Sequence, residues 1–277
     1  EAVFLQDGYR PVERLALNLG IRYSQFSLRA TSRHKKTGEV KLSSTPHAFT
    51  GNANVSCRLR ADLYLMGGVG QGFRAPNVDD MTVLGSFSNG FDVPSSHLAP
   101  EEALTYELGF KRQGRRLTGT VFGFLGSYRS LIDRAPGLFE GLPFLDANHD
   151  STRQADEEAV YERKNIGRAR IYGMEMEGQG RFGRAVSAFG TFAWTRGEDR
   201  VANLPLTRVP PPSGTGGVRW SPGNGSWLEA YTSFAGKQAR LSKADRSDRR
   251  IGITGTPGWA TLNVRGGLAI GPALSLT

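Results

Sequence analysis

The alternation of very short and very long connections between strand-like segments constrains this chain more than any other feature. The segments alternate apolar and polar side chains over about ten residues, as transmembrane β-strands do. The short connections are predicted at residues 8–11, 60–62, 112–115, 182–184, 221–225 and 271–272. The long ones are predicted at residues 30–47, 76–100, 131–161, 197–207 and 239–257. Tight turns on one rim and long loops on the other are typical of a bacterial outer-membrane barrel, whereas a soluble sandwich mixes loop lengths at both ends.

The segments between these connections read as about eleven strands and part of a twelfth, several of them long enough to project beyond a bilayer. They are predicted at residues 1–7, 12–28, 48–60, 62–74, 101–113, 116–130, 161–180, 186–197, 208–220, 227–238, 257–270 and from 274 onward. No segment has a convincing helical period. The sequence therefore predicts an all-β fold, an antiparallel transmembrane β-barrel.

The two faces of these strands differ in polarity. The strand at 161–180 places Tyr172, Met174 and Met176 on one face, and Glu175 and Glu177 on the other. The strand at 257–270 repeats this pattern, with Leu262, Val264 and Leu268 opposite Asn263 and Arg265. We expect the apolar sets to face lipid and the polar sets, including Glu175, Glu177 and Arg265, to face a lumen or a plug. The alternative interpretation is the solvent-exposed face of a large sandwich.

The composition excludes several classes of protein. Hydrophobic residues make up 38% of the chain, and no run approaches the roughly 18 apolar residues that a membrane helix needs. The net charge of +9 raises the question of nucleic acid, but the basic residues are dispersed among acids and no nucleic-acid-binding signature accompanies them. The sequence has no Walker loop, nucleophile elbow or HExxH motif and has only four histidines. We therefore expect neither an enzyme nor a nucleic-acid partner.

Several motifs give these strands a family resemblance. They are Gly72-Phe73-Arg74-Ala75-Pro76-Asn77, then "LAPE" at 98–101 with "YELG" at 106–109, "NIGRARIYGME" at 165–175, "LTRVPP" at 206–211 and "TPGWATLN" at 256–263. Each is weak alone, but their order and spacing resemble the barrel of TonB-dependent outer-membrane receptors over most of the chain.

The resemblance implies an architecture and a function. The family barrel has 22 strands around a plug, so residues 1–277 would be about half of it, from its C-terminal part. The plug, the contact with the TonB complex and the final strands are expected outside this sequence, because both of its ends lie in strand-like segments. Such receptors sit in the bacterial outer membrane, in contact with its lipid, and import scarce nutrients without a cofactor. A ferric siderophore or other iron chelate is the expected substrate. The alternatives are a haem or cobalamin receptor of the same family, or a passive porin.

Histidine and acidic residues in the long loops raise the question of a metal or haem ligand. Haem receptors of the family often carry "NPNL" after the FRAP element, where this chain reads Ser95-Ser96-His97-Leu98. His97 is thus a candidate substrate ligand, although an ordinary loop histidine is the simpler interpretation. Asp146, Asn148 and Asp150 alternate as at the start of a calcium loop, but the glycine that such a loop needs is not in place. We interpret this segment as a solvated acidic loop and predict no metal site.

The remaining candidate substrate contacts are arginines and aromatic residues of the long loops. Guanidinium groups pair with carboxylate and catecholate oxygens, and aromatic rings pack on flat ligands. The candidates are Phe87, Phe91, Phe139, Arg208, Arg240 and Arg249.

Overall fold

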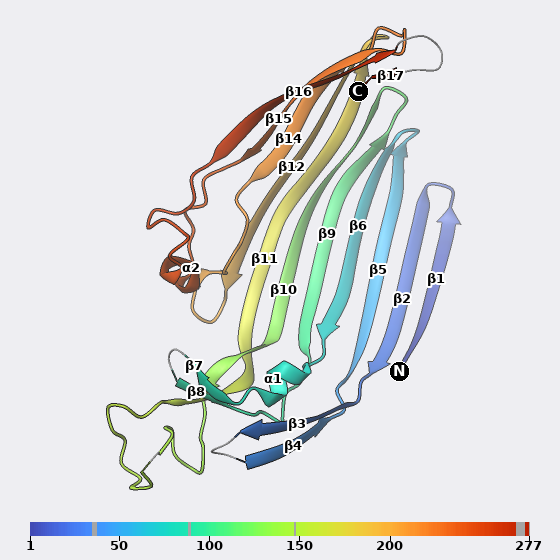
Figure 1. The fold of residues 1–277 in the computed structure, drawn as a ribbon. Helices are drawn as coiled ribbons and strands as arrows, with labels where there is room; N and C mark the ends of the chain where they lie inside the picture. Colours follow the sequence, from blue (N-terminus) through green and yellow to red (C-terminus); the bar gives the residue numbers. More distant parts are fainter. Residues whose placement is uncertain (35–37, 88–89, 147, 270–274, 277) are drawn as a thin grey trace.

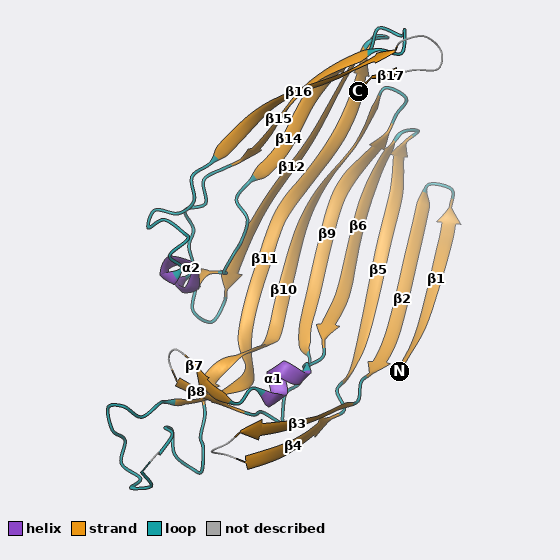
Figure 2. Ribbon diagram, in the orientation of Figure 1, coloured by secondary structure: helices purple, strands orange, loops and turns teal. Residues whose placement is uncertain are grey.

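The computed structural model describes residues 1–277 except 35–37, 88–89, 147, 270–274 and 277. It contains one large curved sheet, whose central strands are antiparallel and neighbours along the chain (Figures 1 and 2). Among the described residues, no helix is long and apolar enough to cross a membrane. The predicted all-β fold is confirmed, and the sheet is an open part of a barrel rather than a closed one.

The main path of the sheet follows the order of the sequence. Its strands are β1 (Ala2–Val12), β2 (Leu15–Gln25), β5 (His47–Arg60), β6 (Leu63–Arg74), β9 (Glu101–Gln113), β10 (Leu117–Pro136), β11 (Val160–Phe182), β12 (Val186–Asp199), β14 (Ser213–Trp220), β15 (Trp227–Ala235), β16 (Trp259–Ala269) and β17 (Ser275–Leu276). Short turns join these strands at one rim, at the top of Figure 1, and long connections join them at the other rim, at the bottom and left of the picture.

The long connections contain structure of their own. They hold β3 (Leu28–His34), β4 (Gly38–Ser44), α1 (Val78–Thr82), β7 (Gly85–Phe87), β8 (Gly90–Val93), β13 (Leu204–Pro205) and α2 (Lys243–Ser247). The segment at 30–47, predicted to be a loop, thus contains the hairpin of β3 and β4. The two helices were not predicted. Each has five residues and begins with a capping box, at Asn77 with Asp80 and at Ser242 with Asp245.

Two predicted strand boundaries were wrong near prolines. The first turn lies at residues 13–14 rather than 8–11, because β1 continues past Pro11 after a register shift between Tyr9 and Val12. An edge strand tolerates a proline whose missing N–H would face away from the neighbouring strand. The strand predicted from residue 208 begins only at Ser213, because prolines 210–212 cannot donate to a ladder and Arg208 has a φ of 61°.

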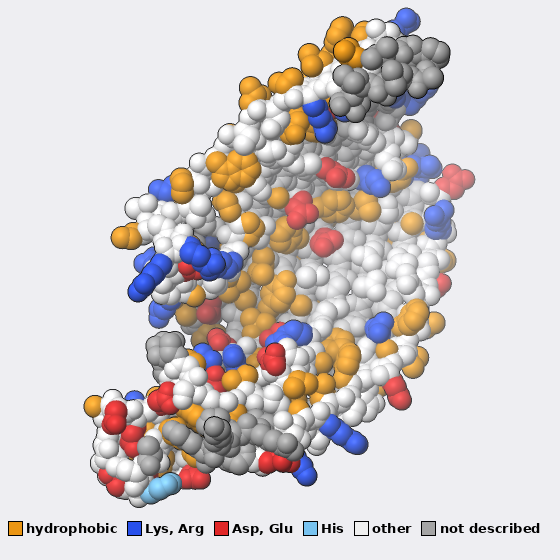
Figure 3. Space-filling view, viewed as in Figure 1, with side chains coloured by type: hydrophobic (Ala, Val, Ile, Leu, Met, Phe, Trp, Pro, Cys, Tyr) orange, Lys and Arg blue, Asp and Glu red, His pale blue; other side chains and the backbone are white. Residues whose placement is uncertain are grey.

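The two faces of the sheet have different environments. On the convex face, Leu262, Val264 and Leu268 are 80%, 66% and 61% exposed. Tyr172, Met174 and Met176 share that face, because they pair in register with Leu125, Gly123 and Val121 of β10. The concave face, into which Figure 3 looks, carries the alternate residues. A broad apolar outer face over a polar inner one is typical of a barrel wall that meets lipid.

The apolar cores of the described residues lie in the long connections and not behind the sheet. One cluster contains Phe91, Val93, Leu145 and Val160. The other contains Leu42, Met81 and Leu98, and joins the β3–β4 hairpin to α1. The loops on this rim are therefore folded units.

Candidate functional site

Arg74, the arginine of the FRAP motif, ties the roots of two long connections together. Its guanidinium donates two hydrogen bonds to the Glu101 carboxylate, of 2.6 and 2.8 Å, and one to Asp80, of 2.6 Å. Glu101 also accepts a hydrogen bond of 2.8 Å from the backbone N–H of Ile132. One ion-paired group thus joins the ends of β6, β9 and β10 to the N-terminal turn of α1. The motif residue Arg74 therefore has a structural role at this part of the rim.

Asn165, the first residue of the "NIGRARIYGME" motif, makes a second tie. Its side-chain amide accepts a hydrogen bond from the N–H of Ala99 and donates one to the Ala99 carbonyl, both of 2.8 Å. It also donates to the carbonyl of Ser130, at 2.7 Å. Ser130 has a φ of 54° and lies where the pairing of β10 and β11 shifts register. Asn165 therefore stabilises the bulge at which these strands leave the barrel wall.

Two long connections fold together into a unit that we call the acidic lobe, made of the described residues of 76–100 and 131–159. Strand β8 runs parallel to the start of β11, with Phe91 beside Val160 and Val93 beside Glu162. Phe91 is fully buried, and the rings of Phe91 and Phe139 lie 6.2 Å apart. The lobe contains ten acidic and two basic side chains, a net charge of −8.

An ion pair with a buried carboxylate lies beside the apolar core of the acidic lobe. Arg134 donates hydrogen bonds of 2.7 and 2.6 Å to the two carboxylate oxygens of Asp92, whose side chain is 5% exposed. The Arg134 guanidinium also lies 3.8 Å from the centre of the Phe87 ring. The Asp92 carboxylate raises the pKa of Arg134. This geometry, bidentate on one side and stacked on the other, suits arginine but not lysine.

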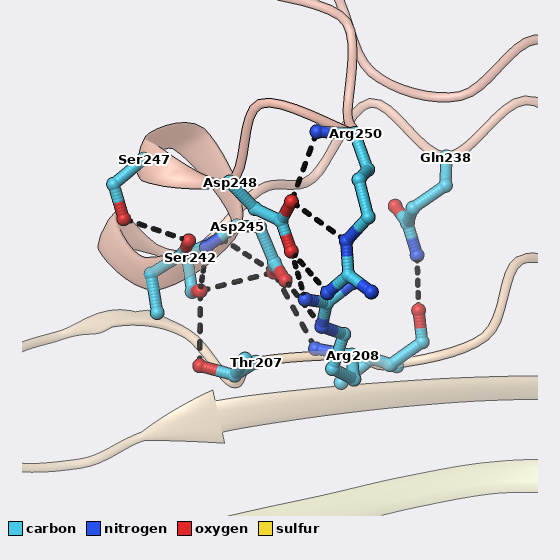
Figure 4. Close-up of polar contacts among 10 residues, drawn as sticks. Thr207, Arg208, Gln238, Ser242, Asp245, Ser247, Asp248 and Arg250 are labelled. Atoms are coloured by element: carbon cyan, nitrogen blue, oxygen red, sulfur yellow. Dashed lines mark hydrogen bonds and ion pairs between the residues drawn. The ribbon is translucent and has the colours of Figure 1, made fainter.

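The connections at 200–212 and 236–258 form a second unit, which we call the basic lobe. It contains eight basic and two acidic side chains, a net charge of +6. Figure 4 shows its centre, the carboxylate of Asp245, which is 4% exposed. Asp245 accepts hydrogen bonds from the Ser242 hydroxyl, at 2.9 Å, and from the Arg208 N–H, at 3.4 Å. The Arg208 guanidinium lies 3.6 Å from the other carboxylate oxygen.

Asp248 extends this polar network toward solvent (Figure 4). It accepts hydrogen bonds from the guanidinium groups of both Arg208 and Arg250. The Gln238 amide donates a hydrogen bond of 2.6 Å to the Val209 carbonyl, and the hydroxyls of Thr207 and Ser242 lie 3.0 Å apart. These contacts join the two connections of the basic lobe.

The pKa values of both aspartates lie below their ordinary value. Burial alone would raise the pKa of Asp245, but hydrogen bonds from Ser242 and Arg208 outweigh burial and lower it. Hydrogen bonds from Arg250 and Arg208 lower the pKa of Asp248. Both carboxylates are therefore ionised at neutral pH.

The concave face contains a hollow of about 820 Å³ in the middle of the sheet, between the short-turn rim and the two lobes (Figure 3). Its lining combines three carboxylates, Glu107, Glu175 and Glu177, with aromatic rings that include Phe122 and Phe124. Glu175 and Glu177 therefore lie on the face at which the alternation placed them. The hollow extends across β9 to β16, as Ser213 of β14, Ser233 of β15 and Trp259 of β16 also line it.

Arg265 lies on the concave face but is paired rather than free. Its side chain donates a hydrogen bond of 2.6 Å to Glu229, which also accepts one of 2.8 Å from Arg219. Glu229 is 2% exposed, so it neutralises part of the charge of the two arginines away from water. This triad crosslinks β14, β15 and β16.

The remaining candidate contacts differ in accessibility. Phe91 belongs to the core of the acidic lobe and Phe139 packs against that core. The Phe87 ring lies under the Arg134 guanidinium and meets the Tyr161 ring edge to face. His97 is exposed, and its Nδ1 lies 2.8 Å from the Ser96 hydroxyl. Arg208 belongs to the Asp245 network.

Two further arginines complete this set. Arg240 forms an ion pair of 3.5 Å with Glu198, which the alternation along β12 places on the convex side. Arg249 is exposed in the basic lobe, and among the described residues its side chain has no ion-pair or hydrogen-bond partner. Among the same residues, no group of three or more His, Cys, Asp and Glu side chains is arranged to hold a metal ion.

The family described as "TonB dependent receptor-like, beta-barrel" matches residues 1–277. The chain belongs to this family. Family members of known structure are outer-membrane β-barrels that act as transport receptors. The motif resemblance to TonB-dependent receptors is therefore confirmed.

Curated relatives and solved structures of TonB-dependent receptors agree with this assignment. The "Hemoglobin-haptoglobin utilization protein B" of Neisseria meningitidis serogroup A / serotype 4A is 26% identical over 60% of this chain and 22% of its own length. The copper transporter OprC has a TM-score of 0.72 at 16% identity, covering 97% of this chain and 39% of that one. A mutant ferric enterobactin receptor, PfeA of Pseudomonas aeruginosa, also gives 0.72 at 16% identity, covering 99% and 38%. The chain thus spans well under half of each of these TonB-dependent receptors.

Proposed function

We propose that this chain is a C-terminal part of the barrel wall of a TonB-dependent receptor that imports an iron chelate across a bacterial outer membrane. In this proposal the concave face, with Glu175, Glu177 and Arg265, faces the lumen and a plug supplied by the rest of the protein. The TonB complex is contacted through that other part. Outer-membrane lipid covers the convex face, where apolar side chains such as Leu262 are exposed.

The observation that carries the choice of substrate is the surplus of positive charge on the basic lobe. In Figure 3, Lys and Arg side chains gather over the region of α2. Arg249 and Arg246 are exposed, and neither side chain has an ion-pair partner among the described residues. A negatively charged chelate would be steered to such a surface and bound there by guanidinium groups. Solved members of the fold include receptors for ferric enterobactin and ferric citrate, which supports an iron chelate.

Haem is the second candidate, and His97 supports it. Its Nδ1 is engaged with Ser96, which leaves the exposed ring free to present Nε2 to a ligand. Curated relatives that use haemoglobin–haptoglobin also favour this candidate.

Growth of the source bacterium with the gene intact or deleted, and with TonB inactivated, tests the proposal. We expect the intact gene to support growth on at least one ferric chelate, and only with active TonB. Growth restored by haem or cobalamin but by no ferric chelate would contradict the substrate and leave the transporter class standing. Uptake that does not require TonB would contradict both.

One matched pair of variants and one single variant separate the candidate substrates. R249Q should reduce uptake of an anionic chelate at limiting concentration, whereas R184Q, which removes an exposed arginine at the opposite rim, should not. H97A should abolish growth on haem only if haem is the substrate. Equal uptake by R249Q and R184Q would mean that Arg249 does not contribute to binding of the substrate.

A further inference from the structure

The convex face of β10, β11 and β12 changes character abruptly toward the long-loop rim. In register, Leu125 of β10 lies beside Tyr172 of β11, and Met174 of β11 lies beside Trp194 of β12. The rings of Tyr172 and Trp194 meet edge to face at 5.9 Å. Aromatic side chains above an apolar belt mark the level at which a bilayer meets its headgroups.

Between these rings and the long-loop rim, the same face carries arginines. Arg196 of β12 lies beside Tyr172. Arg170, two residues from Tyr172 along β11 toward the long-loop rim, lies between Ser127 of β10 and Glu198 of β12. Arg168 follows on the same side of β11. Arg168 and Arg170 are both exposed, and among the described residues neither side chain has a hydrogen-bond or ion-pair partner.

The one acidic side chain within this group is already shared. Glu198 accepts a hydrogen bond of 3.1 Å from Arg196 and lies 3.7 Å from Arg200 and 3.5 Å from Arg240. Three guanidinium groups therefore share a single carboxylate, and Arg170 and Arg168 continue the row on the same face of β11 without an ion-pair partner among the described residues. We call this group, Arg168, Arg170, Arg196, Arg200 and Arg240, the arginine platform. Like charges held this close repel one another unless an anion lies among them.

The arginine platform is local rather than a general property of the rim. At the corresponding level of the convex face, β6 presents Gln71 and Phe73, and β9 presents Leu104 and Glu102. Arg129 of β10 lies directly beside Glu102, which offsets its charge. Excess positive charge on this part of the convex face thus gathers on β11, β12 and the adjacent basic lobe.

We propose that the arginine platform binds the phosphate groups of a lipid headgroup in the outer leaflet of the membrane. The platform lies on the opposite face of the sheet from the concave hollow, so a substrate in the lumen does not reach it. Arginine forks match phosphate oxygens two at a time, and basic clusters beside a membrane belt attract anionic headgroups. The inference rests on the proposed membrane location, but it does not depend on the substrate or on TonB.

The test uses the full-length protein extracted from outer membranes in mild detergent. The variant R168Q/R170Q removes the two unpaired cations, and R181Q/R184Q removes two exposed arginines at the opposite rim as a charge-matched control. Mass spectrometry measures the phosphorylated glycolipid retained per protein. We expect about a tenfold loss in R168Q/R170Q, little change in the control, and partial recovery in R168K/R170K, which retains the charge but not the guanidinium fork. Heat-modifiable migration on gels checks barrel assembly, and the single variants replace the double one if it does not assemble.

A second arm identifies the source of the phosphate. Protein stripped of lipid is offered nanodiscs that contain a diphosphorylated glycolipid, the same lipid without phosphates, or inorganic phosphate in solution. Binding of the phosphorylated lipid alone, lost in R168Q/R170Q, is the expected result. Equal retention in every variant, or equal binding of the dephosphorylated lipid, would overturn the proposal. Iron uptake is measured separately, so a failed substrate assignment leaves the lipid result intact.

Discussion

The acidic and basic lobes leave the same rim of the sheet but are held together in different ways. The acidic lobe has an apolar core around Phe91, and its one buried ion pair, Arg134 with Asp92, lies beside that core. The basic lobe relies on a polar network centred on Asp245. An apolar core tolerates changes in pH and salt, whereas a polar network depends on every partner being present. The comparison indicates that the basic lobe is the easier of the two lobes to unfold locally.

The largest effect is expected from removing the core of the acidic lobe. Replacing Phe91 with alanine deletes a fully buried ring and should destabilise this lobe by about 3–5 kcal/mol. Limited proteolysis should then cleave within residues 137–159 while the basic lobe stays protected. L138A, at a side chain that is 61% exposed, serves as the control. Loss of protection in both lobes would mean that they are a single unit.

A smaller effect is expected at the centre of the basic lobe. D245A removes the acceptor for Ser242 and Arg208 and should cost about 1–3 kcal/mol, because these donors lose their partner. Hydrogen exchange should rise in residues 200–212 and 236–258 together, since the network joins them. D156A, at an exposed aspartate of the acidic lobe, should leave exchange unchanged. Exchange that rises in only one connection would refute the joint unit.

A conservative change at Arg134 tests the ion pair of the acidic lobe. R134K keeps the charge but loses the bidentate contact with Asp92 and the stacking on Phe87. We expect this change to destabilise the acidic lobe by about 1 kcal/mol. The measurement is the same proteolysis assay, with cleavage intermediate between the wild type and F91A. Cleavage as fast as in F91A would mean that the ion pair matters as much as the core.

Acidification from pH 7 to about pH 5 is expected to have almost no effect on the basic lobe. The pKa values of Asp245 and Asp248 are lowered in the folded state, so their contribution is fully present above the ordinary aspartate value. It is lost only as the pH falls through the lowered values. Hydrogen exchange, corrected for intrinsic rate, should therefore be the same at both pH values. A rise between them would assign the lobe's stability to some other group.

Much of the barrel wall could be predicted because lipid and lumen impose a period of two on every strand. Tyr172, Met174 and Met176 alternate with Glu175 and Glu177 clearly enough to assign faces without coordinates. Strand boundaries near proline were harder to predict. Pro11 reads as a turn residue, yet an edge strand accommodates it, and this depends on a neighbour that the local sequence does not reveal.

The rim was predicted less well, because its contacts join segments far apart in the chain. Phe91 was a candidate ligand contact because it is an aromatic residue of a long loop. Its partner Val160 begins β11, far along the chain, so the local sequence did not reveal that Phe91 is buried. The motif residues Arg74 and Asn165 signalled the family, while their structural role emerged only from Glu101 and Ala99. The capping boxes at Asn77 and Ser242 were a usable signal for the two short helices.

The parallel pairing of β8 with β11 also sets an order of events during assembly. Because β9 and β10 separate Phe91 from Val160 along the chain, we expect these two residues to come together only after β9 and β10 have added to the sheet. Closing so long a loop has an entropic cost that the intervening hairpin removes. During refolding, the wall would therefore form before the acidic lobe, and a probe at Phe91 would report a later phase than one at Tyr172. A cell would insert the wall before this part of its outer surface was complete.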